Sequence, residues 1–168
     1  MKKIIALLLA AALCLSASAF AATYTHDDDI TFEYDDKYFE IAMDDHTDDE
    51  DLIVLTDKNG GSISIQVLEL EDGEKFPTPA DFESAEVKPT SEVETLETWA
   101  NFKNVLNFSY DSEENHQDVF IAPVYDDDGE IDAVLTVSIT GQPIADEDAA
   151  TESSDRISEV VDTLRVND

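Results

Sequence analysis

The 168-residue sequence lacks most of the groups on which common enzyme sites and covalent cross-links depend. Its one cysteine, Cys14, lies in the apolar N-terminal run, so the rest of the chain can form no disulfide. No serine lies in a G-x-S-x-G motif, and Gly60-Gly61 is explained by a hairpin turn rather than by a phosphate-binding loop. These absences argue against serine and cysteine hydrolases and nucleotide-dependent enzymes, and we predict a non-catalytic protein.

Basic residues are also scarce, since 9 lysines and arginines face 41 aspartates and glutamates and the formal charge is −32. Such a surface repels phosphate backbones and anionic lipid headgroups, so we expect no binding to nucleic acid or to an anionic membrane surface. A cationic protein partner or a divalent metal ion is compatible with it. The simpler explanation is that dense carboxylates keep the protein soluble, and we expect a monomer.

Residues 1–21 have the three parts of a secretory signal peptide of bacterial type. Two lysines precede an apolar run over residues 4–15, and Ala19 and Ala21 then fit the A-x-A rule of signal peptidase. The apolar run is shorter than the roughly 20 residues of a membrane-spanning helix. We therefore predict a secreted or extracytoplasmic protein that is cleaved after Ala21, with Ala19 as a second cleavage point.

Cys14 raises the alternative of a lipid anchor. A lipoprotein cysteine would need a small residue directly before it, whereas Leu13 occupies that position and Cys14 lies inside the apolar run. We therefore expect Cys14 to leave with the signal peptide, and lipid anchoring is the minority alternative. Cleavage leaves 147 residues with a formal charge of −34, a length that suits one domain.

Alternation of apolar and polar residues predicts most strands of this domain. Residues 22–29 lack a clear pattern and are predicted to form a flexible acidic leader before a single domain at 30–168. Asn59-Gly60 predicts a type I′ hairpin turn, and Pro123 should lie at an edge or a bulge because it cannot donate to a ladder. Strands are predicted at 30–34 and 39–43 (paired in a hairpin), 52–55, 63–67, 104–110, 119–125 and 131–140.

Three helices complete the prediction. Thr78-Pro79 begins a short helix that Pro89 ends, and Ser91 with Glu94 forms a capping box for a second helix. An amphipathic helix over residues 148–166 closes the chain. This order predicts an α+β fold, an antiparallel sheet of about six or seven strands packed by helices.

The order of these elements resembles the PsbP-like family, whose fold is also that of a small Ran-binding nuclear-transport factor. The resemblance implies an α/β/α sandwich whose closing helix packs on the sheet and often ends in a short extended tail. It also implies a non-enzymatic binding or assembly role, because the family's members are mostly exported subunits of that kind. The segments that carry it are ITFEYDDKYFEIAM (30–43), SISIQVLEL (62–70), VFIAPVYDDDGEIDAVLTVSIT (119–140) and ISEVVDTLRV (157–166).

Calcium is the metal that the sequence favours, which makes a low-affinity cation-binding secreted protein our alternative function. Asp126, Asp127, Asp128 and Glu130 crowd one turn, residues 44–51 contain a second acidic run, and calcium takes six to eight oxygen ligands. Neither segment has the EF-hand register, and hydrated turns explain both acidic clusters more simply. We predict no other cofactor and no defined catalytic residue.

The histidines His26, His46 and His116 all lie beside acids, a combination that suits zinc or another transition metal. No two of them have the i, i+4 spacing of H-E-x-x-H, and in a chain this acidic such neighbours are expected by chance. We therefore predict no histidine site. An acid-pair hydrolase ranks last, because acid pairs occur throughout the sequence and distinguish nothing.

Overall fold

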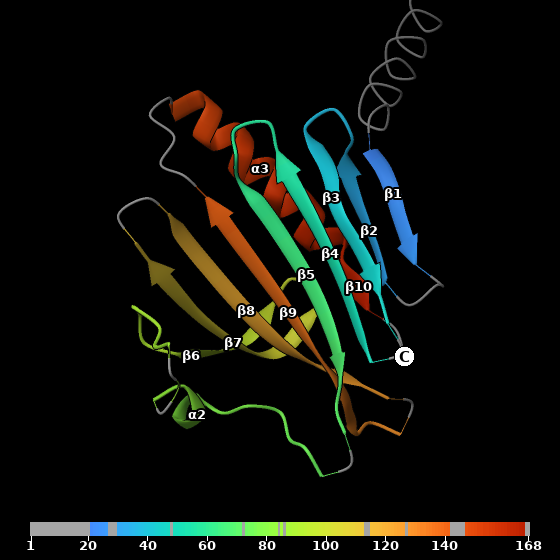
Figure 1. Cartoon of the computed structure of the whole chain (residues 1–168), viewed down its shortest axis with the longest axis vertical. Helices are drawn as coiled ribbons and strands as arrows, with labels where there is room; N and C mark the ends of the chain where they lie inside the picture. Colours follow the sequence, from blue (N-terminus) through green and yellow to red (C-terminus); the bar gives the residue numbers. More distant parts are fainter. Residues whose placement is uncertain are drawn as a thin grey trace, which may run out of the picture.

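The computed structural model of the chain describes residues 21–26, 30–47, 49–71, 73–83, 85, 87–112, 115–126, 128–141 and 147–166. Within these residues ten strands form two antiparallel sheets, and two helices accompany them (Figure 1). The predicted α+β class is confirmed, but the strands form two sheets, of seven and of three strands, rather than the single sheet of about six or seven that the sequence predicts. No helix in the described ranges is both long enough and apolar enough to cross a membrane.

The larger sheet has seven strands in the order β3-β4-β5-β9-β8-β7-β6, and the smaller sheet has the order β1-β2-β10. The helices are α2 (Pro79–Glu83) and α3 (Glu147–Thr163). The strands are β1 (Ala21–His26), β2 (Ile30–Asp35), β3 (Phe39–His46), β4 (Glu50–Asp57), β5 (Ser62–Glu69), β6 (Glu94–Trp99), β7 (Phe102–Asp111), β8 (His116–Tyr125), β9 (Ile131–Gly141) and β10 (Arg165–Val166).

The main core lies between the larger sheet on one side and α3 with the smaller sheet on the other. Phe32 of β2 and Val160 and Leu164 of α3 are fully buried there. They pack on the alternate, inward-facing residues of β4, β5 and β9, which are also buried: Ile53, Leu55, Ile63, Ile65, Leu135 and Val137. Each such side chain contributes about 1.5–3 kcal/mol when it leaves water. This core fixes α3 behind the larger sheet in Figure 1.

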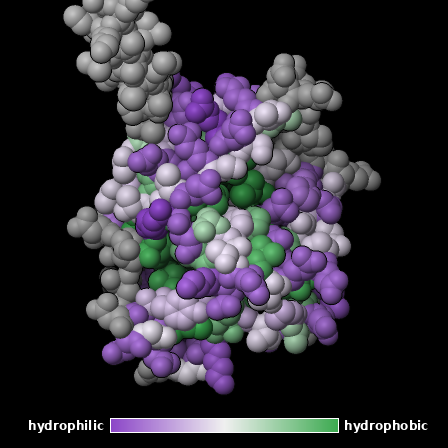
Figure 2. Space-filling view, turned by 180° about the vertical axis from the view of Figure 1, so that it is seen from behind, coloured by the Kyte–Doolittle hydropathy of each residue, from purple (hydrophilic) through white to green (hydrophobic). Residues whose placement is uncertain are grey.

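The opposite face of the larger sheet is covered only in part. Phe76, Phe82 and Val93 pack there on a second buried cluster formed by β7 and β8, which consists of Leu106, Phe108, Val119 and Ile121. Seen from the α3 side, the molecule shows hydrophobic side chains in its centre surrounded by hydrophilic ones (Figure 2). The two faces of the sheet are therefore packed by different segments.

The hairpin predicted over residues 30–43 is wrong, because β2 and β3 lie in different sheets. A turn between them, in which Tyr38 N donates to Asp35 O at 2.9 Å, carries the chain from one sheet to the other. Both strands bury alternate residues in the same core, Phe32 from one layer and Phe39 from the other. Period-2 alternation reports which face of a strand is buried and does not report its neighbour.

The flexible leader predicted at residues 22–29 is a strand in its described part. β1 pairs with β2 along its whole length, from Ala21↔Asp35 to His26↔Ile30. Tyr24 is 9% exposed and stacks on Phe32 with ring centroids 4.8 Å apart. The folded domain therefore begins before residue 30, and residues 27–29 lie outside the described part.

The helix predicted after the Ser91–Glu94 capping box is strand β6, which pairs with β7. Leu96 and Trp99 have a spacing that also fits a helix, but the ETLETW segment is rich in threonine and tryptophan, which favour strands. Trp99 stacks on Phe120 of β8 at 4.0 Å and 6°. The predicted closing helix is present as α3 and ends at Thr163, after which β10 pairs with β2.

The β4–β5 and β8–β9 hairpins, both predicted, close through the same type of turn. Gly60 and Gly129 have φ values of 86° and 84°, and their N–H groups donate to Asp57 O and Asp126 O, respectively. This is a three-residue loop that ends in a left-handed glycine, so the predicted two-residue type I′ turn is wrong. Pro123 lies beyond the last β7–β8 pair and near the β8–β9 bulge, whose extra residue is Asp132 of β9.

Candidate metal centre

The carboxylates predicted to bind calcium belong to the β8–β9 turn. Asp126 Oδ1 accepts a hydrogen bond from Glu130 N at 2.8 Å and so helps to close the turn. Asp127 lies outside the described residues. Within the described part of the chain, Asp126, Asp128 and Glu130 do not form a group of three with converging ligand atoms. Calcium binding at this turn stays a prediction, as does cleavage after Ala19 or Ala21, of which only Ala21, at the start of β1, is described.

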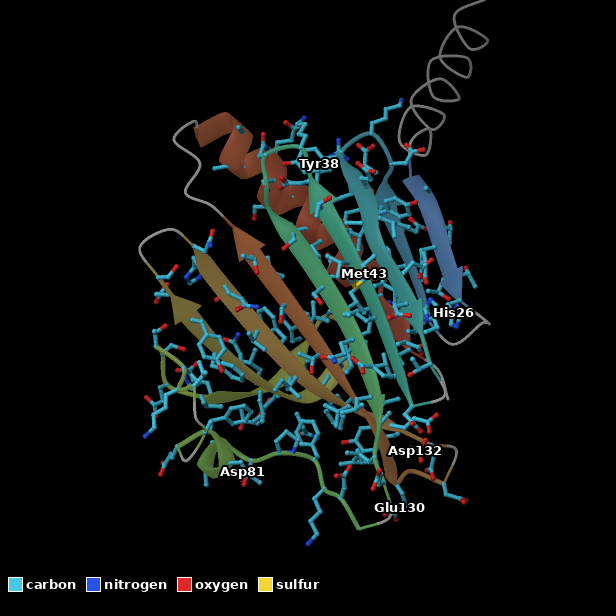
Figure 3. The ribbon with its side chains drawn as sticks, in the orientation of Figure 1. His26, Tyr38, Met43, Asp81, Glu130 and Asp132 are labelled. Atoms are coloured by element: carbon cyan, nitrogen blue, oxygen red, sulfur yellow. The ribbon has the colours of Figure 1, made fainter. Side chains whose placement is uncertain are left out.

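Three other residues do converge. His26, His46 and Asp51 each offer one ligand atom, and these three atoms lie within 4.8 Å of one another. His26 ends β1, His46 ends β3, and Asp51 lies at the start of β4, directly opposite His46 in the β3–β4 register. Figure 3 shows His26 where β1 and β3 end. The group therefore joins the smaller sheet to the larger one.

A β-bulge in β3 turns His46 toward β1. The register shifts between Ile41 and Met43, so that Ile41 pairs with Leu55 but Met43 pairs with Val54. The extra residue reverses the alternation, and Met43 faces outward with 48% of its surface exposed. His46 consequently lies on the same face as the buried Ile53 and can meet the side chains of β1.

The geometry within the group is tight. His46 Nδ1 is 2.6 Å from Asp51 Oδ1, and His26 Nε2 is 3.9 Å from the same oxygen. The two imidazole rings are stacked with centroids 3.4 Å apart and planes 3° apart. Each of the three side chains keeps about a quarter of its surface in contact with solvent, 28% for His26, 20% for His46 and 23% for Asp51. An ion could therefore reach the group from the solvent.

A second carboxylate fixes the orientation of His46. Asp44 Oδ1 lies 2.7 Å from His46 Nε2 and also accepts a hydrogen bond from the Tyr24 hydroxyl at 2.6 Å. A carboxylate on the far nitrogen of a histidine is the usual outer partner of a metal-binding imidazole, because it sets the tautomer and the ring plane. Asp44 and Tyr24 thus leave Nδ1 of His46 as the nitrogen directed at Asp51.

These contacts shift the ionisation of the residues involved. Burial alone would lower the pKa of His46, but its hydrogen bonds to Asp51 and Asp44 outweigh burial and raise that pKa. Burial, together with the hydrogen bond to Asp44, raises the pKa of Tyr24 well above its ordinary value. The hydrogen bond from Tyr24, followed by that from His46, lowers the pKa of Asp44. Asp44 is therefore ionised at neutral pH, as an outer partner of a ligand must be.

The arrangement can hold a tetrahedral ion once two interatomic distances change and one ring turns. Zinc bonds of about 2.0–2.2 Å to nitrogen and oxygen place neighbouring ligand atoms about 3.3 Å apart. The pair His46 Nδ1–Asp51 Oδ1 must therefore open from 2.6 Å, and the pair His26 Nε2–Asp51 Oδ1 must close from 3.9 Å, each by less than about 1 Å. One ring must also rotate out of the stack, because stacked rings direct their lone pairs in parallel.

His116 provides a comparison within the same chain. It lies at the start of β8, and its two ring nitrogens contact Asp111 and Asp118, the second at 3.2 Å. The hydrogen bond to Asp111 raises the pKa of His116. However, no second histidine is part of this contact, and within the described residues it is not among the groups that could hold a metal. It is an exposed ion pair at a hairpin end.

Sequence reasoning singled out all three histidines but missed their arrangement. The ligands come from three strands in two sheets, and His26 falls in the segment predicted to be a flexible leader. The one local signal is the pair of acids flanking His46, Asp44 two residues before it and Asp51 five residues after it. No protein-family model, curated protein or solved structure matches the chain, so the geometry alone indicates what the group does.

Proposed function

We propose that the mature domain is an exported, non-catalytic protein that binds one divalent transition-metal ion, such as Zn²⁺, through His26, His46 and Asp51. The observation that carries this proposal is the convergence of two imidazole nitrogens and one carboxylate oxygen within 4.8 Å. The Asp44–Tyr24 pair behind His46 adds support, because it is an outer shell of the kind that metal-binding histidines have.

The donor set selects the class of ion. Calcium and magnesium prefer oxygen ligands, whereas imidazole nitrogen suits zinc, copper and nickel. Three protein ligands leave a fourth tetrahedral position for water or a further ligand. The formal charge of −34 on the mature chain adds a general attraction for cations, which raises their local concentration without choosing among them.

Calorimetric titration of the metal-free mature chain with zinc tests the proposal. An excess of calcium is included, so that the many exposed carboxylates are occupied and only a nitrogen-containing site gives a signal. We expect saturation at one zinc ion per chain. The His26→Gln and Asp51→Asn variants should lose at least about tenfold in affinity, since even the loss of an outer-shell partner costs about 10–100-fold.

His116→Gln is the matched control, because it removes a histidine that also contacts two carboxylates but lies at the β7–β8 hairpin, outside the proposed metal site. This variant should bind zinc as the unsubstituted chain does. The proposal fails if calcium abolishes the heat of zinc binding, or if His116→Gln weakens binding as much as His26→Gln.

The export and the finer fold belong to the same proposal. Export is supported by the three-part signal at residues 1–21, and a non-catalytic role by the absence of a nucleophile motif from the sequence. A PsbP-like sandwich is supported by α3, which packs on one face of the antiparallel sheet, and by the short β10 tail that follows it. N-terminal sequencing of the secreted protein tests export and should begin at Ala22.

A further inference from the structure

The outward face of β4, β5 and β9 carries no charge over eleven consecutive outward positions. We call these positions the neutral face. Inward residues on these strands are buried, so the alternate residues face the other way. They are Leu52, Val54, Thr56, Ser62, Ser64, Gln66, Leu68, Val134, Thr136, Ser138 and Thr140.

The neutral face is continuous and open. In the strand register Ser64 of β5 lies between Val54 of β4 and Ser138 of β9. The neighbouring outward residues of β5 have outward partners on β4 and β9 in the same way. β4, β5 and β9 lie in the foreground of Figure 1, with α3 behind them. All eleven residues keep solvent contact, and Leu68 is 42% exposed, while Val134 at one end also packs on the second buried cluster.

The absence of charge is selective. Charged residues make up 30% of the chain, so about four would be expected among the twelve positions that include Glu50, the remaining outward residue of β4, and Glu50 is the one charge among them. On β9 the charge begins again at Asp132, just before the face. At the border, Glu50 at the start of β4 accepts a hydrogen bond from Gln66 Nε2. Glu40 and Asp45 point outward from the neighbouring β3.

We infer that the neutral face binds a second copy of this chain, sheet against sheet. A cationic partner would gain most where carboxylates are dense, and this face has none. Two copies of the mature chain each carry −34, and they repel one another least where both surfaces are uncharged. Serine and threonine hydroxyls can both donate and accept, so a hydroxyl-rich face is complementary to itself.

The size of the neutral face sets the strength of this association. With strands about 4.8 Å apart and about 3.4 Å per residue, five residues of β4 (52–56) and seven each of β5 (62–68) and β9 (134–140) cover about 310 Å². A standard interface buries about 800 Å² per partner, so even with contributions from the flanking strands β3 and β8 the contact is small. The dimer should therefore be weak and form only at high protein concentration. A monomer at low concentration, as expected from the charge, is compatible with it.

Sedimentation velocity between about 1 μM and about 1 mM protein tests the inference at low and at high sodium chloride. Salt screens the repulsion between the two acidic copies, so dimer formation should increase at high salt. A complex with a cationic partner would weaken instead. Ser64→Glu places a charge in the centre of the neutral face and should reduce association at least about tenfold.

Thr98→Glu is the control, because it adds the same charge at an exposed position of β6, on the other edge of the sheet. It should leave association unchanged, and circular dichroism melts should show that both variants remain folded. The inference is overturned if the protein stays monomeric at high concentration and high salt, or if Ser64→Glu has no more effect than Thr98→Glu. Because the neutral face is separate from the histidines, either result leaves the proposed metal site unaffected.

Discussion

Replacing Asp57 by alanine tests how the β4–β5 hairpin is held against α3. The Asp57 side chain is 9% exposed, which is unusual for a carboxylate in such an acidic protein. Its Oδ1 accepts hydrogen bonds from Asn59 N at 2.6 Å and Gly61 N at 2.9 Å, and Ser153 Oγ of α3 donates to Oδ2 at 3.3 Å. The carboxylate therefore closes the turn and binds the helix at the same time.

The expected loss follows from these three hydrogen bonds. A hydrogen bond to a charged group contributes about 1.5–3 kcal/mol, but three bonds to one carboxylate do not add fully, and water can reach the freed turn amides. We expect Asp57→Ala to lower the free energy of unfolding by about 3–4 kcal/mol. For a domain of this size the melting temperature should fall by about 6–16 °C.

Urea and thermal unfolding, followed by circular dichroism, measure this loss. Asp126→Ala is the control, because Asp126 helps to close the equivalent β8–β9 turn, where its carboxylate accepts one hydrogen bond among the described residues, from Glu130 N. That variant should cost only about 1 kcal/mol. If Asp57→Ala costs no more than Asp126→Ala, the contact with Ser153 and the burial of the carboxylate do not stabilise the fold.

Two further results follow from backbone strain and from the exposed ion pair. Ala100 begins the β6–β7 turn with φ at 50°, a backbone conformation that is unfavourable for alanine. Ala100→Gly should therefore raise the free energy of unfolding, measured in urea, by about 0.5–1 kcal/mol. A loss of stability would show that the backbone at Ala100 is not strained. The carboxylate of Asp111 raises the pKa of His116. Protonated His116 should therefore stabilise the fold fully below the ordinary histidine pKa of about 6.5. This stabilisation should be lost as the pH rises through the higher pKa that His116 has in the folded protein. Titration by NMR should show that raised pKa and its decrease in Asp111→Asn, whereas a pKa at or below about 6.5 in the unsubstituted protein would refute the pairing.

The elements that the sequence predicted well are those in which one local pattern determines the structure. The β8–β9 hairpin combines unbroken alternation over residues 131–139 with a glycine-containing turn, and α3 has a helical spacing of apolar residues that one face of the sheet buries. The pairing of β2 could not be predicted, because alternation marks a buried face and leaves the neighbour open. β6 was mistaken for a helix because Leu96 and Trp99 fit both periods.

The metal centre depends on features that no spacing reveals. Its ligands lie on three strands, and their meeting requires β1 to pair with β2 and β2 to lie in a different sheet from β3. It also requires the bulge after Ile41, whereas the sequence places Met43 in phase with Phe39 and Ile41. Met43 has the alternation of a buried residue but faces solvent, and the same bulge lets His46 face inward.

X-ray absorption spectroscopy at the zinc edge tests the proposed function most directly, because it identifies the atoms bound to the ion. With one zinc ion per chain and calcium in excess, we expect two imidazole nitrogens at about 2.0–2.1 Å and carboxylate or water oxygen in the remaining positions. His46→Gln should remove one imidazole from this shell, and His116→Gln should leave it unchanged. A shell made of oxygen alone would show that zinc occupies surface carboxylates, and it would contradict a centre formed by His26, His46 and Asp51.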